Sequence, residues 1–396
     1  MAMCKSGCTI FSPLLNDGGS MMAKAKSDGV AVSVLDKDGL GDFIKNLRKS
    51  GYQVFGPRRD NDAVIYDLID GADDFPAGWG SEQKGGHYRL RQRDDGALFG
   101  YGLGPQGWKR QLYPPRQKLF AATRTEGGGF TLAPPAPPAP PMAFIGVRAC
   151  ELAAIARQAK VFGDRDFADP GYQRRLADAL IVAVQCGEAL ETCFCASMGT
   201  GPEVKGGFDI KLTEVIDKNR HVFVAEAGTP RGAKLLKAAK PASQADIKAA
   251  AQVVKNAETQ QKHLDPAAAR ALAANPEHPR WDQVAARCLT CGNCTMVCPT
   301  CFCTTVEDVT DLKGDNAERW RKWDSCFTSD FSYIHGGAVR TETRSRYRQW
   351  ITHKLSTWVD QFDETGCVGC GRCITWCPVG IDITEEAAVI TGQGRI

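Results

Sequence analysis

The sequence predicts an α+β protein in which an N-terminal α/β domain precedes a mainly helical, cysteine-rich domain. The strand-like run Met142–Val147 is followed by a helical stretch, Glu151–Val161, and by a second strand-like run, Ala179–Val184. This order is typical of an α/β layer. Residues 232–275 are rich in alanine and lysine, which favours helices between the two halves. Most of the 17 cysteines lie in tight clusters beyond residue 280.

We divide the chain into four segments: a tail at 1–30, an α/β domain at 31–228, a helical connector at 229–280 and a helical cysteine-rich domain at 281–396. The tail contains Cys4 and Cys8, for which the sequence indicates no role, and we expect it to be poorly ordered because chain ends usually are.

Local patterns define the smaller elements of the α/β domain. Asp42–Ser50 is predicted to be a helix, while Tyr52–Phe55 and Ala63–Leu68 resemble strands. The polyproline stretch Ala133–Pro141 cannot pack as helix or sheet, and we expect a semi-rigid connector there.

Composition and charge exclude several classes of protein. The net charge is +3, from 49 basic and 46 acidic residues, which is too balanced for a typical nucleic-acid binder. No apolar run approaches the roughly 18 residues of a membrane span, and the N-terminus lacks the pattern of a secretory signal. Cysteines clustered in a long chain indicate metal binding in a reducing compartment, so we expect a cytoplasmic protein.

Two cysteine runs with identical spacing carry the strongest functional signal. Cys288, Cys291, Cys294 and Cys298 form the first run, which ends in Pro299. The second run ends in Pro378 and consists of Cys367, Cys370, Cys373 and Cys377. Both runs match the C-x₂-C-x₂-C-x₃-C-P pattern of cubane iron–sulfur proteins.

In two-cluster ferredoxins the last cysteine of each run binds the other cluster. We therefore predict two [4Fe–4S] clusters. The first thiol set is Cys288, Cys291, Cys294 and Cys377, and the second thiol set is Cys367, Cys370, Cys373 and Cys298. A pair of structural zinc sites is the alternative, although zinc sites favour separate CxxC pairs.

The spacing between the runs predicts an expanded, ferredoxin-like dicluster domain. Cys298 and Cys367 lie far apart in sequence, and the intervening segments Asp315–Trp323 and Arg340–Trp358 look helical. His335, His353 and the tryptophans of this region are expected to be structural. We find no Ser/His/Asp arrangement or phosphate-binding loop, and so predict no catalytic residue apart from the metal sites.

Four further cysteines could hold a third cluster. Cys150 and Cys186 each follow a predicted strand, and parallel strands open on one edge of a sheet, where α/β proteins place their sites. Cys193 and Cys195 follow on the next loop. This third thiol set is a candidate [4Fe–4S] site, while zinc or inert buried thiols remain alternatives. Cys301, Cys303 and Cys326 are expected to pack near a cluster, or to act as substitute ligands.

Several segments resemble one protein family. They are Phe144–Leu152, Cys193–Pro202, Ala286–Val309 and Asp324–Arg340. They are similar to the 4Fe–4S dicluster family that contains the beta subunit of cytosolic nickel–iron hydrogenases, or sulfhydrogenases. A more distant similarity is to one of the subunits of anaerobic sulfite reductase. The resemblance extends roughly from Gly51 to the C-terminus.

The resemblance implies a non-catalytic electron-transfer subunit of an oxidoreductase complex. The implied partners are a flavin subunit that handles NAD(P)H, the nickel–iron subunit that splits hydrogen, and a small cluster subunit. Two alternatives stay open at this point. The chain could take part directly in sulfur, polysulfide or sulfite reduction, or it could be a structural adaptor whose clusters only hold the fold.

Overall fold

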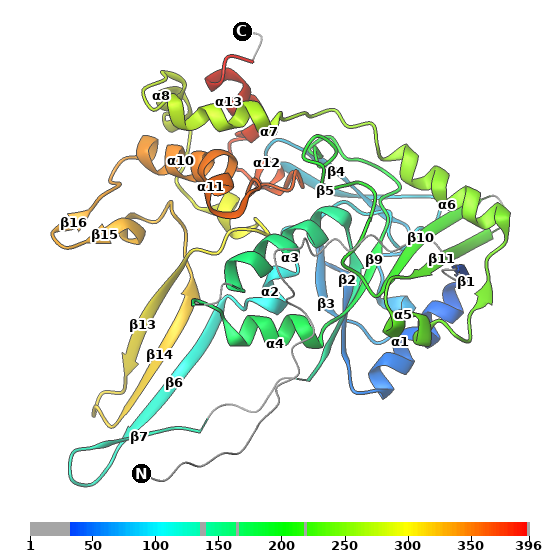
Figure 1. Cartoon of the computed structure of the whole chain (residues 1–396), viewed down its shortest axis with the longest axis horizontal. Coiled ribbons are helices and arrows are strands. Elements are labelled where there is room, and N and C mark those ends of the chain that lie inside the picture. Colours follow the sequence, from blue (N-terminus) through cyan, green and yellow to red (C-terminus); the bar gives the residue numbers. More distant parts are fainter. Residues whose placement is uncertain (1–31, 135–139, 164–165, 218–219, 394–396) are drawn as a thin grey trace, which may run out of the picture.

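The computed structural model describes residues 32–134, 140–163, 166–217 and 220–393. The predicted tail with Cys4 and Cys8 lies outside these residues, as does the centre of the polyproline stretch. The described part combines helices and strands (Figure 1), in agreement with an α+β protein. It contains no helix that is long and apolar enough to cross a membrane.

An eight-stranded mixed sheet forms the centre of the N-terminal half. The neighbouring strands β2, β8, β9 and β10 run parallel, and antiparallel strands extend the sheet at both ends. In spatial order the strands are β12 (Lys240–Pro241), β1 (Val32–Leu35), β11 (Arg220–Ala227), β10 (Ile210–Asp217), β9 (Leu180–Val184), β8 (Met142–Val147), β2 (Gln53–Asp60) and β3 (Ala63–Leu68). Because β12 lies within 229–280, part of the predicted helical connector completes this sheet.

The central strands are buried on both faces, which explains their continuous apolar sequences. Alternate residues of β9 enter different cores: Val182 and Val184 face one cluster, while Ile181 and Ala183 face another. Helices cover both faces (Figure 1). They are α1 (Lys37–Lys49), α2 (Lys109–Leu112), α3 (Ala149–Phe162), α4 (Pro170–Asp178), α5 (Pro230–Leu235) and α6 (Gln244–Asn256). The predicted strand–helix–strand order around α3 is confirmed.

Short helices form the cysteine-rich end of the molecule (Figure 1). Their shared core is aromatic and includes Trp281, Tyr347 and Trp350. A π-helical turn, His353–Thr357, joins two of the helices, so the predicted helix at Arg340–Trp358 is confirmed. The helices are α7 (Pro266–Ala269), α8 (Arg280–Ala285), α9 (Asn293–Met296), α10 (Thr343–Thr352), α11 (Trp358–Phe362), α12 (Arg372–Thr375) and α13 (Ile383–Ile390).

A four-stranded antiparallel sheet projects from the body as an arm (Figure 1). Its spatial order is β13 (Thr304–Thr310), β14 (Asn316–Trp323), β6 (Arg116–Arg124) and β7 (Phe130–Leu132). The prediction of a helix at Asp315–Trp323 is therefore wrong. This segment is a strand because β13 and β6 pair with it on its two sides. Two separate hairpins pair β4 (Trp79–Lys84) with β5 (His87–Gln92) and β15 (Tyr333–Ile334) with β16 (Gly337–Ala338).

Candidate metal centres

The two cysteine runs adopt the same backbone path. Gly292 and Gly371 both have a left-handed φ of 74° and precede the short helices α9 and α12. Two residues earlier, Thr290 and Gly369 have φ values of 51° and 63°. Each run therefore turns tightly between its second and third cysteines and presents them on one loop. The sequence repeat is a structural repeat.

The last thiol of each run lies beside the other run. In the first thiol set, Cys377 is close to Cys288 and Cys294, and these residues line one cavity with Cys291. In the second thiol set, Cys298 is close to the remaining three members, which are Cys367, Cys370 and Cys373. The structure thus brings together the residues of both crossed sets.

The chemistry of these donor sets fits [4Fe–4S] clusters, since each set offers four thiols. Burial raises the pKa of Cys367 to about 11 and that of Cys294 well above its ordinary value, so a metal must displace these protons to bind. In the described part of the chain, no three His, Cys, Asp or Glu side chains are placed to hold one metal ion. A cubane has a different requirement, because each thiolate binds a separate iron around its rim.

Backbone amides point at some of these sulfurs. The Ile381 amide donates to Cys377 Sγ at 3.3 Å, and the Gly369 amide donates to Cys367 Sγ at 3.5 Å. Such hydrogen bonds tune the reduction potential of iron–sulfur clusters.

A buried lysine accompanies the second thiol set. The Lys354 side chain is 3% exposed, and its Nζ donates to Cys298 Sγ at 3.4 Å and to Thr300 Oγ1 at 2.9 Å. Burial alone would lower the Lys354 pKa, but thiolate charge on Cys298, Cys301 and Cys367 outweighs it and raises that pKa well above its ordinary value. The lysine therefore carries a positive charge next to this set.

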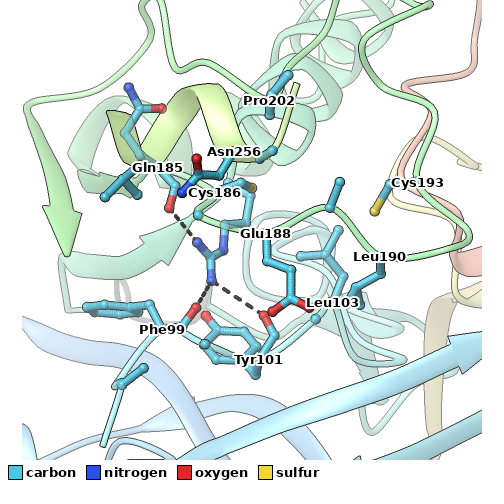
Figure 2. Close-up of a pocket in the computed structure, with 18 of the residues that line it drawn as sticks. Phe99, Tyr101, Leu103, Gln185, Cys186, Glu188, Leu190, Cys193, Pro202 and Asn256 are labelled. Carbon is cyan, nitrogen blue, oxygen red and sulfur yellow. Dashed lines mark hydrogen bonds between the residues drawn. The ribbon is translucent and has the colours of Figure 1, made fainter. Parts of the chain in front are cut away.

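The third thiol set also comes together. Cys150 begins helix α3 after strand β8, and Cys186 follows β9. These parallel neighbours end at the same edge of the sheet. Cys193 and Cys195 reach this edge from the next loop, and all four thiols line one cavity of about 350 Å³ (Figure 2). Burial raises the pKa of Cys195 to about 12, so metal binding would again displace a proton.

A buried arginine balances charge at the third set. Arg148 is 4% exposed and donates to the carbonyl oxygens of Gln185 at 2.7 Å and Phe99 at 2.5 Å (Figure 2). Its guanidinium also interacts with Cys186. A cationic wall suits an anionic group held by thiolates in this cavity.

The third and second thiol sets are neighbours. Cys370 of the second set lines the same cavity as the third set. The Phe194 amide donates to the Gly369 carbonyl at 2.9 Å. A Cβ on Gly369 would lie 2.6 Å from Cys195 Cα, and one on Gly371 would lie 2.3 Å from the Thr192 carbonyl oxygen. These two glycines therefore let the third-set loop pack directly on the second cysteine run.

The three remaining described thiols lie close to the same region. Cys301 contacts Cys298, and Cys303 contacts Cys326. Sequence reasoning also missed the charged residues Lys354, Arg148 and Arg372. For the two arginines a signal existed, since Arg148 lies two residues before Cys150 and Arg372 lies between two cysteines of the second run. Lys354 had no such signal, because it reaches Cys298 only through tertiary packing.

Comparison with known proteins agrees with this geometry. A 4Fe-4S dicluster domain matches residues 287–381, which include both cysteine runs. The chain is 33% identical over 244 residues to sulfhydrogenase 2 subunit beta of Pyrococcus furiosus, covering 60% of this chain and 70% of that protein. The chain belongs to the sulfhydrogenase beta-subunit family. The family resemblance of the sequence is thereby confirmed, while no solved structure matches this sulfhydrogenase-like chain.

Proposed function

We propose that this chain is the electron-transfer subunit of a hydrogenase-type complex and does not itself split hydrogen. The observation that carries the proposal is the crossed pair of thiol sets inside a 4Fe-4S dicluster domain. When bound, each [4Fe–4S] cluster supplies a centre that takes up and releases one electron. The first set would hold one cluster, the second set another and the third set a candidate third.

The chain's own residues fix and shield these centres. Because Cys298 and Cys377 cross between the runs, neither thiol set can move without the other. Phe327, Tyr347 and Trp350 line the cavity of the first set and keep water from most of it. A dry, rigid surrounding limits reorganisation and influences the reduction potential.

The three sets lie in a row, which supports a path along the chain. Cys370 of the second set borders the cavity of the third set, and Cys373 lies beside Cys294 of the first set. At the far end, Cys291 is exposed and its neighbour Leu289 is 60% exposed. Electrons would therefore pass between the sheet edge and the surface around Cys291 through the buried second set.

The family supports the identity of the partners. The Pyrococcus relative is named as the beta subunit of a sulfhydrogenase. We infer that this chain connects a nickel–iron hydrogenase subunit with a flavin subunit that handles NAD(P)H, together with a small cluster subunit. Clustered cysteines outside a short disulfide framework support a reducing, cytoplasmic location.

Metal analysis of the anaerobically purified chain tests the proposal. We expect acid-labile sulfide and about eight irons per chain for two [4Fe–4S] clusters, or about twelve if the third set is also loaded. EPR of the reduced protein should show cluster signals that titrate reversibly. Iron near zero, or clusters that resist reduction, would overturn the relay.

Co-purification from the native source tests the partners. We expect nickel–iron and flavin subunits to accompany the chain. Reduction of polysulfide or sulfite by the isolated chain with an artificial electron donor would instead show a direct catalytic role.

A further inference from the structure

Two thiols outside the three sets meet where the arm joins the body. Cys303 immediately precedes β13, and Thr304 at the start of β13 pairs with Trp323 at the end of β14. The ladder continues for one more bond, since the Asp324 amide donates to the Cys303 carbonyl at 2.8 Å. A turn at Ser325–Thr328 then brings the Cys326 thiol into hydrogen-bond contact with Cys303.

We propose that Cys303 and Cys326 form a redox-active dithiol–disulfide pair that exchanges electrons with the neighbouring clusters. Forming the disulfide breaks two S–H bonds, makes one S–S bond and releases two protons and two electrons. The protons go to solvent. The electrons go to two one-electron acceptors, which are the oxidised clusters of the first and second thiol sets, so this inference rests on the proposed function.

The position of the pair supports this exchange. Cys326 lies close to Cys294 of the first set. Cys303 and Cys326 both interact with Lys354, whose Nζ donates to Cys298 of the second set at 3.4 Å. The pair is therefore next to both proposed one-electron centres, and the shared Lys354 cation stabilises negative charge on either sulfur.

The chemical state of the two sulfurs also fits. The hydrogen bond from Cys326 lowers the pKa of Cys303 and raises that of Cys326. The contact therefore favours a thiolate at Cys303 next to a thiol at Cys326, and the thiolate is the form that reacts in disulfide chemistry. Both cysteines are only partly buried, so their protons can reach solvent.

Such a pair would store two electrons beside carriers that move one at a time. A dithiol couple is a two-electron couple, whereas each cubane transfers one electron. The pair would match the single-electron traffic of the clusters to chemistry that needs electrons in twos.

Thiol mapping of the holo-protein tests the pair directly. The chain, purified anaerobically with its iron, is reduced, then oxidised stepwise with viologen mediators, quenched in acid and alkylated. In a tryptic digest the peptide Trp323–Arg340 contains Cys326 as its single cysteine. On oxidation we expect it to become linked to the peptide Cys288–Lys313, with fragmentation placing the bond at Cys303. Cys301 in that peptide should stay alkylated and serves as the internal control.

Electron counting gives a second readout. Oxidation of the reduced wild-type protein should yield about two more electrons per chain than oxidation of Cys326→Ser or Cys303→Ser at equal iron content. If Cys326 stays fully alkylated while the iron count and EPR signals are intact, the pair is overturned and the relay stands. If iron is absent, the relay itself fails. A failure of either variant to fold leaves the wild-type mapping decisive.

Discussion

Glu151 and Arg372 form an ion pair at 2.6 Å in which both side chains are 1% exposed. Glu151 follows Cys150 in α3, and Arg372 precedes Cys373 in α12, so the pair links the third thiol set to the second. The carboxylate also accepts from the Tyr66 hydroxyl at 2.9 Å, and the guanidinium donates to the Gly104 carbonyl at 2.9 Å. The α/β half and the cysteine-rich half are thus joined by a charged contact with no access to water.

Breaking this pair should destabilise the whole chain. Glu151→Ala leaves the Arg372 cation buried without its partner, which we expect to lower the free energy of unfolding by about 3–5 kcal/mol. Anaerobic denaturant unfolding measures the change. Asp360→Ala is the matched control, because it removes the exposed Arg270–Asp360 pair and should cost at most about 1 kcal/mol. Equal losses in the two variants would contradict a special role for the buried pair.

The crossed ligation can be tested by exchanging single thiols. Cys298→Ser should damage the cluster of Cys367, Cys370 and Cys373, although Cys298 belongs to the other run in sequence. Cys377→Ser should damage the cluster of the first run. EPR and iron analysis of both variants distinguish the two clusters if their signals differ. Damage to the cluster of the same run in each variant would show that ligation is not crossed.

Packing at Gly369 should control loading of the third set. Gly369→Ala places a methyl group 2.6 Å from the Cys195 backbone at a φ of +63°, so we expect it to displace the third-set loop and to lower iron content and thermal stability. Gly199→Ala is the matched control. Its φ is +67°, with no neighbour within 4 Å of the added methyl group, so it carries the backbone strain without the clash. The prediction fails if the two variants bind iron equally.

The Lys354 cation should raise the reduction potential of the second cluster. A positive charge favours the reduced, more negative state, so Lys354→Met should shift that potential downward. A unit charge at about 4 Å contributes roughly 4 kcal/mol at an effective dielectric of 20, which sets an upper limit on the order of 150 mV, since 59 mV is a factor of ten for one electron. EPR-monitored redox titration measures the shift. An unchanged potential at full iron content would argue against the electrostatic role of this lysine.

The sequence predicted those parts of the molecule that depend on local patterns. The apolar runs of β8 and β9 identified strands, and the spacing of Cys288–Cys298 and Cys367–Cys377 identified the two cysteine runs. The convergence of Cys150 and Cys186 followed from the rule that parallel strands end at one edge. In each case the deciding information lay within a few residues, or in one topological rule.

The missed parts depend on partners far away in the chain. Asn316–Trp323 is polar and charged along its length, because both faces of the arm are partly accessible. It therefore lacks the alternation that marks a half-buried strand. Its pairing with β6 joins residues about 200 positions apart, such as Arg319 and Phe120. The approach of Lys354 to Cys298, and of the third-set loop to Gly369, likewise arises from packing alone.

The shared arm has a consequence for dissecting this protein. Strand β14 of the C-terminal half pairs directly with β6 of the N-terminal half. A fragment that starts near residue 281 would leave a whole edge of β14 unpaired, and such edges recruit other chains into aggregates. The iron-binding end is therefore not a detachable module. Expression trials and crystallisation should keep both halves in one polypeptide, or supply the missing strand in trans.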